Sequence, residues 1–178
     1  MRSGRGRSRP GSLAERVQES VNLIVLAGTE ARFIATAESA QVLRVGSRAG
    51  RSLPAHLTSG GKALLAAMEP DEVTALYEAV GEVDLPRLRR ELALVRKRGF
   101  AINDQKTEAG LTAVAVEIRD TAGRGVASVA LAMPSVRFGR ERLPEWLSAL
   151  RTTAAAVTRA LVGGPVRQGK VGQGKVRV

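Results

Sequence analysis

The sequence predicts an α+β fold, in which helices pack on a central, mostly antiparallel sheet of about six strands. Short runs rich in β-branched residues follow one another closely, and two of them flank a turn-forming segment at 120–123. Other segments carry apolar residues at spacings of three and four, as amphipathic helices do. The 178 residues, 44% of them hydrophobic, are enough to bury the core that such a fold needs.

The first third of the chain predicts one helix followed by three strands. Ser12 and Glu15 have the spacing of a capping box, which opens a short helix that ends near Glu19. Three short runs with tight connections follow, and they predict an antiparallel meander. These predicted strands cover residues 21–27, 32–38 and 41–46.

Three helices are predicted in the middle of the chain. Thr58 caps a helix that ends before Pro70, and a second short helix covers 71–80. A third begins at Pro86 and ends at Gly99, a residue type that suits the left-handed position after a helix. The outer face of this third helix carries mostly arginine and lysine, which we interpret as a solvated surface rather than a phosphate site.

The last part predicts three strands and a long helix. The strands are 100–103 and the hairpin formed by 111–118 and 125–133, and the helix spans 143–161. The complete order is helix, three strands, three helices, three strands, helix. A sheet of about six strands flanked by helices is an economical way to bury these faces, and the arrangement is that of a GAF-like domain.

Two tails are predicted outside this fold. Residues 1–11 and 164–178 are rich in glycine and basic residues, so we expect disorder there and place the folded domain at 12–163. The tails carry eight arginines and lysines and no acid, which leaves the body a charge of only +3 out of the total of +11. The basic charge therefore permits weak contact of the tails with nucleic acid but does not predict a folded basic face.

Composition excludes several classes of function. Only 3% of the residues are aromatic, which is too few for a platform that stacks single-stranded bases, and the chain has no cysteine. No stretch is long and apolar enough to span a membrane, and the basic start is not followed by the apolar core of a signal peptide. We expect a soluble, cytoplasmic protein with no membrane partner.

The segment Thr58-Ser59-Gly60-Gly61-Lys62 contains the main candidate site. Two glycines in the first turn of a helix destabilise it, so their presence needs a reason. One reason is functional, because unobstructed N–H groups at a helix start, aided by the helix dipole, bind carboxylates and phosphates. The other is packing, in which a close neighbour leaves no room for a Cβ. The sequence does not choose between the two.

Catalytic motifs are weak in this chain. Lys62 is followed by Ala63 and no glycine stands at the earlier position, so the segment is not a P-loop. Ser59 and Lys62 have the spacing of serine acyl-enzymes, but neither of the companion motifs follows. His56 is the only histidine, and we interpret it as a loop residue with a backbone partner. We therefore expect no enzyme, no metal site and no cofactor.

The segment 53–66 resembles the IclR family of bacterial transcription regulators, where a Pro-x-His-x-Thr loop leads into a Gly-Lys-Ala-Leu-Leu-Ala helix. Later segments are similar to the same family in order and spacing. They are Gly99-Phe100-Ala101-Ile102-Asn103-Asp104, Glu108-Ala109-Gly110-Leu111, Ile118-Arg119-Asp120, Met133-Pro134 and Arg137-Phe138. The resemblance covers about 12–162 and concerns the effector-binding half of these regulators.

This resemblance implies a GAF-like domain that binds a small carboxylate and assembles as a homodimer or homotetramer. The anionic group would meet the helix start at Ser59 and Gly60, beside Gly61. Residues of the sheet would close the pocket, at Asn103, Leu111, Ala113, Ala130 and Ala132. Members that take small hydroxy or keto acids carry Asp, Cys or Ser at several of these positions, so we expect a roomier, more apolar pocket here. An aromatic or medium-sized carboxylate fits that expectation, and a pocket that no longer binds is the alternative.

The family places a winged helix-turn-helix domain before the sensor, whereas this chain has only eleven residues there, four of them arginine. Nothing in 1–11 can place a recognition helix in a major groove. We therefore expect contact with DNA only through a winged helix domain that this chain lacks. The alternatives to a carboxylate sensor are an oligomerisation module without a ligand and, more remotely, a serine acyl-transfer enzyme that uses Ser59 and Lys62.

Overall fold

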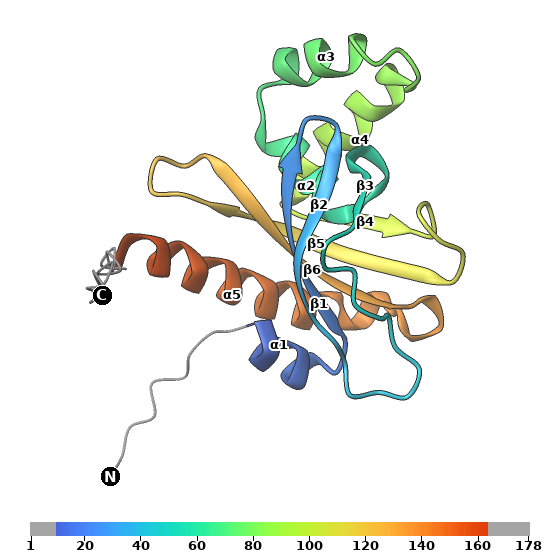
Figure 1. The fold of residues 1–178 in the computed structure, drawn as a ribbon, viewed down its shortest axis with the longest axis vertical. Coiled ribbons are helices and arrows are strands. Elements are labelled where there is room, and N and C mark those ends of the chain that lie inside the picture. Colours follow the sequence, from blue (N-terminus) through green and yellow to red (C-terminus); the bar gives the residue numbers. More distant parts are fainter. Residues whose placement is uncertain (1–9, 164–178) are drawn as a thin grey trace, which may run out of the picture.

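The computed structural model describes residues 10–163 and shows one six-stranded sheet with helices on both faces (Figure 1). All neighbouring strands are antiparallel, and the order across the sheet is β3-β2-β1-β6-β5-β4. The strands are β1 (Ser20–Ala27), β2 (Glu30–Ala37), β3 (Ser52–Pro54), β4 (Ala101–Asp104), β5 (Leu111–Arg119) and β6 (Gly125–Pro134). The predicted α+β class and the six-stranded, mostly antiparallel sheet are confirmed.

Five α-helices and three short 3-10 turns complete the fold. The helices are α1 (Pro10–Val17), α2 (Ser59–Ala67), α3 (Pro70–Glu78), α4 (Leu85–Arg98) and α5 (Leu143–Gly163). The 3-10 turns are η1 (Ala55–Leu57), η2 (Ser135–Arg137) and η3 (Arg140–Arg142). The long helix α5 and the short helix α1 lie on one side of the sheet, and α2, α3 and α4 gather on the other (Figure 1).

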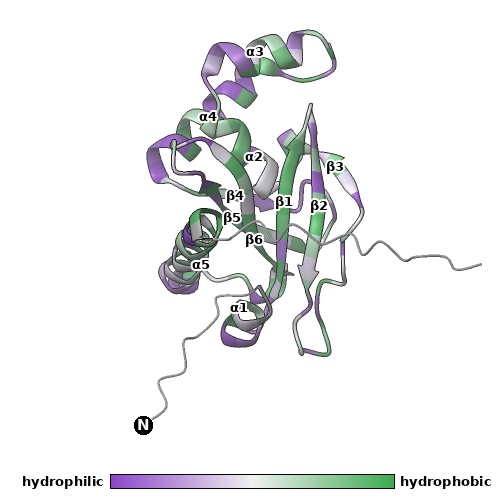
Figure 2. Cartoon of the chain, turned by 60° about the vertical axis from the view of Figure 1, so that its left-hand side comes forward, coloured by the Kyte–Doolittle hydropathy of each residue, from purple (hydrophilic) through white to green (hydrophobic). Residues whose placement is uncertain are grey.

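The face of the sheet under α1 and α5 carries the larger apolar side chains. Trp146 and Leu150 of α5 are fully buried there, against strand residues such as Val114 and Leu131. Burial of these side chains removes most of the apolar surface of α5 from water, which is why a helix with this spacing of apolar residues is stable on the sheet. Figure 2 shows hydrophobic residues along β1 and both hydrophobic and hydrophilic residues on α5.

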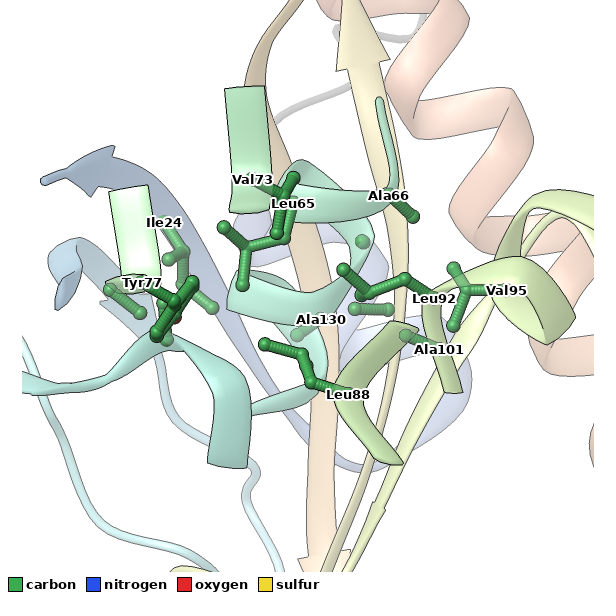
Figure 3. Packing of buried hydrophobic residues seen from close by; sticks show 14 of the residues in the cluster. Ile24, Leu65, Ala66, Val73, Tyr77, Leu88, Leu92, Val95, Ala101 and Ala130 are labelled. Carbon is green, nitrogen blue, oxygen red and sulfur yellow. The ribbon is translucent and has the colours of Figure 1, made fainter. Parts of the chain in front are cut away.

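The opposite face carries smaller side chains under α2. Leu65 of α2 packs with Leu92 of α4 above the alanine Ala130 of β6, and Figure 3 shows side chains of these elements in one cluster. Eight of the nine residues of α2 are buried, in agreement with its mostly small and apolar composition. This helix therefore lies in the middle of the domain rather than on its surface.

The predicted cap at Thr58 and the predicted left-handed Gly99 are present. The Thr58 hydroxyl accepts a hydrogen bond from the Gly61 N–H at 2.9 Å, and Asp84 caps α4 through the Arg87 N–H. Gly99 follows α4 with φ of +79°, the left-handed conformation that glycine adopts without strain. In the β5–β6 hairpin, the Asp120 carboxylate accepts from the N–H groups of Ala122 and Arg124.

The predicted third strand at 41–46 is wrong. These residues lie in a loop, where Val42 is 98% exposed and Leu43 is 60% exposed, and the third strand is Ser52–Pro54 instead. Residues after the loop take the hydrogen bonds of the sheet edge, because Phe33 N–H donates to the Arg51 carbonyl at 2.9 Å and Gly50 N–H donates back to the Phe33 carbonyl. Residues 41–46 do not form a strand because residues 50–54 already occupy the edge of β2.

The start of the domain also differs from the prediction. Helix α1 begins at Pro10, so Ser12 lies inside the helix rather than at its cap, and residues 10 and 11 are not part of a tail. A proline suits the first position of a helix. The helix ends at Val17, where Gln18 takes a φ of +58°. The remainder of the predicted tails, residues 1–9 and 164–178, lies outside the described residues.

Candidate functional site

A small hollow lies between the start of α2 and the sheet. Its volume is about 20 Å³, which is room for one water molecule. Six of the eight predicted site residues line it: Ser59, Asn103, Leu111, Ala113, Ala130 and Ala132. Gly60 and Gly61 do not. Its other walls come from Asn22, Ile24, Phe33, Arg48, Leu53, Thr58 and Thr107.

Strand register explains why these sheet residues meet. Asn103, Ala113 and Ala132 are direct partners across β4, β5 and β6, and Ala130 lies in the next row beside Asn22 of β1. Since side chains alternate along a strand, residues two apart point to the same face. Small side chains in these rows leave the space that becomes the hollow.

Packing accounts for the two glycines. A Cβ on Gly60 would overlap the Ile24 side chain and lie 2.8 Å from the Ser128 hydroxyl. A Cβ on Gly61 would overlap the backbone of Ala55 and lie 2.5 Å from the Thr58 hydroxyl. Neither glycine lines the hollow. The absence of a Cβ at both positions lets α2 approach the sheet and η1, and their predicted contact with a ligand stays a prediction.

The N–H groups of the first turn divide into two pairs. Gly61 donates to the Thr58 hydroxyl and Lys62 donates to the Thr58 carbonyl. The N–H groups of Ser59 and Gly60 have no acceptor within residues 10–163. The Ser59 side chain is also without a hydrogen-bond partner in that part of the chain, although the residue is only 3% exposed. Ser59 therefore offers unused donors beside the hollow.

Asn103 is already engaged. Its amide nitrogen donates to the Thr107 hydroxyl at 2.8 Å, and its carbonyl oxygen accepts from the Lys106 N–H at 2.9 Å. These bonds hold the segment after β4 against the hollow. The side chain thus shapes the wall, and a ligand would compete with Thr107 and Lys106 for it.

Arg48 is the site residue that sequence reasoning missed. Its side chain is only 10% exposed, it lines the hollow, and it forms an ion pair of 2.5 Å with Glu108, whose side chain is 59% exposed. The long-range pairing of the 38–51 loop with the 105–110 loop leaves no periodic signal in the sequence. The only clue was a basic residue in the loop before the glycines.

The 38–51 loop closes the hollow. Val45 packs against Leu111, Ala113 and Ala132, and its carbonyl accepts a hydrogen bond of 2.6 Å from the Ser20 hydroxyl. In this conformation the cavity is smaller than the roomy pocket expected from the sequence. A benzoate-sized molecule is larger than this hollow, so it fits only if part of the wall moves.

Lys62 and His56 belong to a different region. Lys62 Nζ donates to the Ile102 carbonyl at 2.6 Å and lies 3.8 Å from Glu91, and burial lowers the pKa of its ammonium group. His56 packs edge-on against Tyr77, with ring centres 5.8 Å apart. Within the described residues Ser59 and Lys62 share no hydrogen bond, so the arrangement of a serine acyl-enzyme is not formed.

Two further features bear on the site. Among residues 10–163, no group of three or more His, Asp or Glu side chains is arranged to hold a metal ion. The helices in that range include none with the length and apolar character required to cross a membrane.

Comparison with known proteins decides the family. The family model described as the bacterial transcriptional regulator IclR C-terminal domain matches residues 9–159. The chain belongs to the IclR family. It is the effector-binding domain of a transcription regulator of this family, and the resemblance that residues 53–66 indicate is confirmed.

Relatives of known name agree with this assignment. The HTH-type transcriptional repressor AllR of Salmonella paratyphi A is 30% identical over 151 residues, 80% of this chain and 56% of the repressor. The chain thus spans about half the length of the curated relatives it matches. The structure of the IclR protein of Thermotoga maritima is 30% identical, with a TM-score of 0.76 over 84% of this chain and 64% of that one.

A ligand-bound domain has the same fold. The inducer-binding domain of the transcription factor PobR from Acinetobacter, a double mutant in complex with 3-hydroxybenzoic acid, gives a TM-score of 0.77 at 24% identity. It covers 85% of this chain and 94% of that chain. Relatives of this IclR-family domain are regulators of transcription rather than enzymes.

Proposed function

We propose that this IclR-family domain senses a small carboxylate, which binds in the hollow between the start of α2 and the alanine rows of β5 and β6. The observation that carries the proposal is the set of donors without an acceptor within residues 10–163 at the start of α2: the N–H and hydroxyl of Ser59, which lines the hollow, and the N–H of the adjacent Gly60. A carboxylate in the hollow can accept from the two Ser59 donors.

The helix geometry favours an anion at this place. The free N–H groups of a first turn and the positive end of the helix dipole both attract negative charge. Arg48 adds a buried guanidinium to the same hollow, and guanidinium groups bind carboxylates through paired, charge-assisted hydrogen bonds. Glu108 pairs with this guanidinium, so a ligand carboxylate would compete with Glu108 for it.

The rest of the wall favours an aromatic or medium-sized acid. Leu111 and three alanines give part of the wall an apolar character, and the Asn103 side chain is already engaged by Thr107 and Lys106. Movement of the 38–51 loop would enlarge this space, because Val45 packs against three residues of its wall. A double mutant of the PobR domain, which has the same fold, is in complex with 3-hydroxybenzoic acid.

Calorimetric titration of the purified chain tests the proposal. The titrants are glyoxylate, pyruvate and 3-hydroxybenzoate, with 3-hydroxybenzamide as an uncharged control. We expect saturable binding of the aromatic acid and none of the amide. Tighter binding of glyoxylate or pyruvate would overturn the size assignment, and no binding by any of the acids would overturn the sensing role.

We also propose that the domain works as a homodimer or homotetramer and reaches DNA only through a winged helix domain. Several large apolar side chains are exposed, as at an assembly surface: Ile34, Val42, Leu43 and Val136. As a sensor that serves transcription, the protein would work in the cytoplasm. Light scattering after size exclusion tests the assembly, and selective binding of an operator by this chain at moderate salt would contradict the second part.

An oligomerisation module without a ligand is the alternative function. The small volume of the hollow and the seal formed by Val45 favour it. Melting temperature separates the two, because a ligand that binds only the folded state must stabilise that state. A rise with 3-hydroxybenzoate supports the sensor, whereas an assembled protein whose melting temperature no acid changes supports the module.

A further inference from the structure

We propose that Arg48 binds the effector carboxylate directly and that Glu108 occupies its guanidinium group until the effector replaces it. This inference rests on the proposed function, because it assigns a partner to the anion in the same hollow. Glu108 would then compete with the effector for Arg48. The strength of the Arg48–Glu108 ion pair would limit the affinity for the effector.

The two partners of this ion pair differ in burial. The Arg48 side chain is 10% exposed and lines the hollow, whereas the Glu108 side chain is 59% exposed and does not line it. A buried guanidinium is strongly destabilised without an anion, but an exposed carboxylate returns to water at small cost. The pair is therefore suited to an exchange in which the effector carboxylate replaces Glu108 as the partner of Arg48.

Arg48 is held in place without the help of Glu108. Its backbone N–H donates to the Thr36 hydroxyl at 3.1 Å, and that hydroxyl donates to the Asn22 side-chain oxygen at 2.7 Å. This chain of bonds ties the loop to β2 and β1 next to the hollow. Departure of Glu108 would thus leave the Arg48 backbone in place beside the hollow that its side chain lines.

Arg48 has one acidic partner. Among the described residues, Glu108 alone forms an ion pair with it. The pair joins the 38–51 loop to the segment between β4 and β5, and Val45 of the same loop packs against Leu111, Ala113 and Ala132. Exchange of Glu108 for a ligand would remove this tie between the two segments.

The test compares Glu108→Gln with the wild-type chain by calorimetry, with 3-hydroxybenzoate, pyruvate and glyoxylate as probes and 3-hydroxybenzamide as the uncharged control. Loss of the competing charge should tighten binding of the acid that the wild type binds by about twofold to fivefold, the range expected for an ion pair with an exposed carboxylate. Binding of the amide should not change. Glu145→Gln is the matched control, since Glu145 is 62% exposed and pairs with Arg142 outside the hollow.

Arg48→Gln should weaken binding of the same acid by about tenfold or more, because a charge-assisted hydrogen bond is lost. Arg48→Lys keeps the positive charge but loses the paired donors of the guanidinium. Its affinity for the acid should lie between those of the wild type and Arg48→Gln. Thermal melts show whether each variant is folded, and Glu108→Gln with an intact Arg48 keeps the test valid if Arg48→Gln unfolds.

The outcomes separate this inference from the proposed function. If the wild type binds an acid and Glu108→Gln binds it with equal or lower affinity, the proposed exchange is wrong and the proposed sensing function stands. Failure of the wild type and of Glu108→Gln to bind any of the three acids overturns both. Tighter binding by Glu108→Gln together with an unchanged Glu145→Gln supports both.

Discussion

The two faces of the β5–β6 hairpin differ in the size of their side chains. Toward α5 the two strands present large apolar residues, among them Val116, Ile118, Leu131 and Met133, all at most 3% exposed. Toward α2 the same strands present alanine and serine at every second position, in the rows of Ala113, Ala115, Ala130 and Ala132 and at Ser128.

This difference shows how one hairpin can serve stability on one face and binding on the other. Large side chains fill the space under α5 and contribute most of the burial. Small side chains let α2 approach, so that Ser128 Oγ donates to the Gly60 carbonyl at 3.1 Å, and they leave the hollow beside Ser59. Changes on the first face should therefore affect unfolding, and changes on the second should affect ligand binding.

The largest effect is expected on the face toward α5. Leu131→Ala removes a side chain that is fully buried between the sheet and α5, and it should lower the free energy of unfolding by about 3 kcal/mol through lost burial and the cavity that remains. Urea denaturation followed by circular dichroism measures this change. A loss below about 1 kcal/mol would mean that this face is not tightly packed.

A glycine that permits the close approach of α2 should come next. Gly60→Ala places a Cβ against Ile24 and Ser128, so the free energy of unfolding should fall by about 2 kcal/mol from overpacking. Gly46→Ala is the matched control, because its Cβ meets only the Glu38 side chain at 3.5 Å, an ordinary contact. Equal stability of the two variants would contradict the packing role of Gly60.

Filling the hollow should change binding more than stability. Ala132→Val adds two methyl groups at the hollow, so affinity for 3-hydroxybenzoate should fall by about tenfold, equivalent to about 1.4 kcal/mol. Ala127→Val is the control on the opposite face of β6, where Ala127 packs with the α5 core, and it should leave affinity unchanged. Calorimetry measures both, and equal effects of the two variants would remove the distinction between the faces.

The smallest effect is expected at the turn that joins the two strands. Hydrogen bonds from Arg124 and Ala122 lower the pKa of Asp120, so the stabilisation it gives is present above its unfolded pKa and is lost as the pH falls through its lower folded pKa. Asp120→Asn should therefore melt slightly below the wild type at pH 7, and the gap should close in strong acid. A gap that does not depend on pH would mean that the charge of Asp120 does not contribute.

Local patterns predicted most of the fold, and they failed where pairing is long-range. Periodicity and caps gave the five helices and five of the six strands, because these signals lie within one element. Val42 and Leu43 look like strand residues, yet the edge of β2 is taken by residues 50–54, and nothing near 41–46 reveals that competition.

The same contrast between local patterns and long-range contacts explains which site residues could be predicted. The resemblance and the small residues of the hairpin indicated six residues that meet at the hollow, since strand alternation carries them to one face. Asn22, Arg48 and Glu108 were missed, because they reach the site from separate segments through side-chain contacts. The packing role of Gly60 and Gly61 also required the positions of Ile24 and Ala55.

A crystal structure of the chain grown with 3-bromobenzoate tests the central claim most directly, because bromine gives an anomalous signal that locates the ligand. The account predicts a bromine peak among Ala113, Ala130 and Ala132, with the carboxylate at the Ser59 N–H and the 38–51 loop displaced from its present position. A peak elsewhere on the protein, with Val45 still in contact with Leu111, would contradict it.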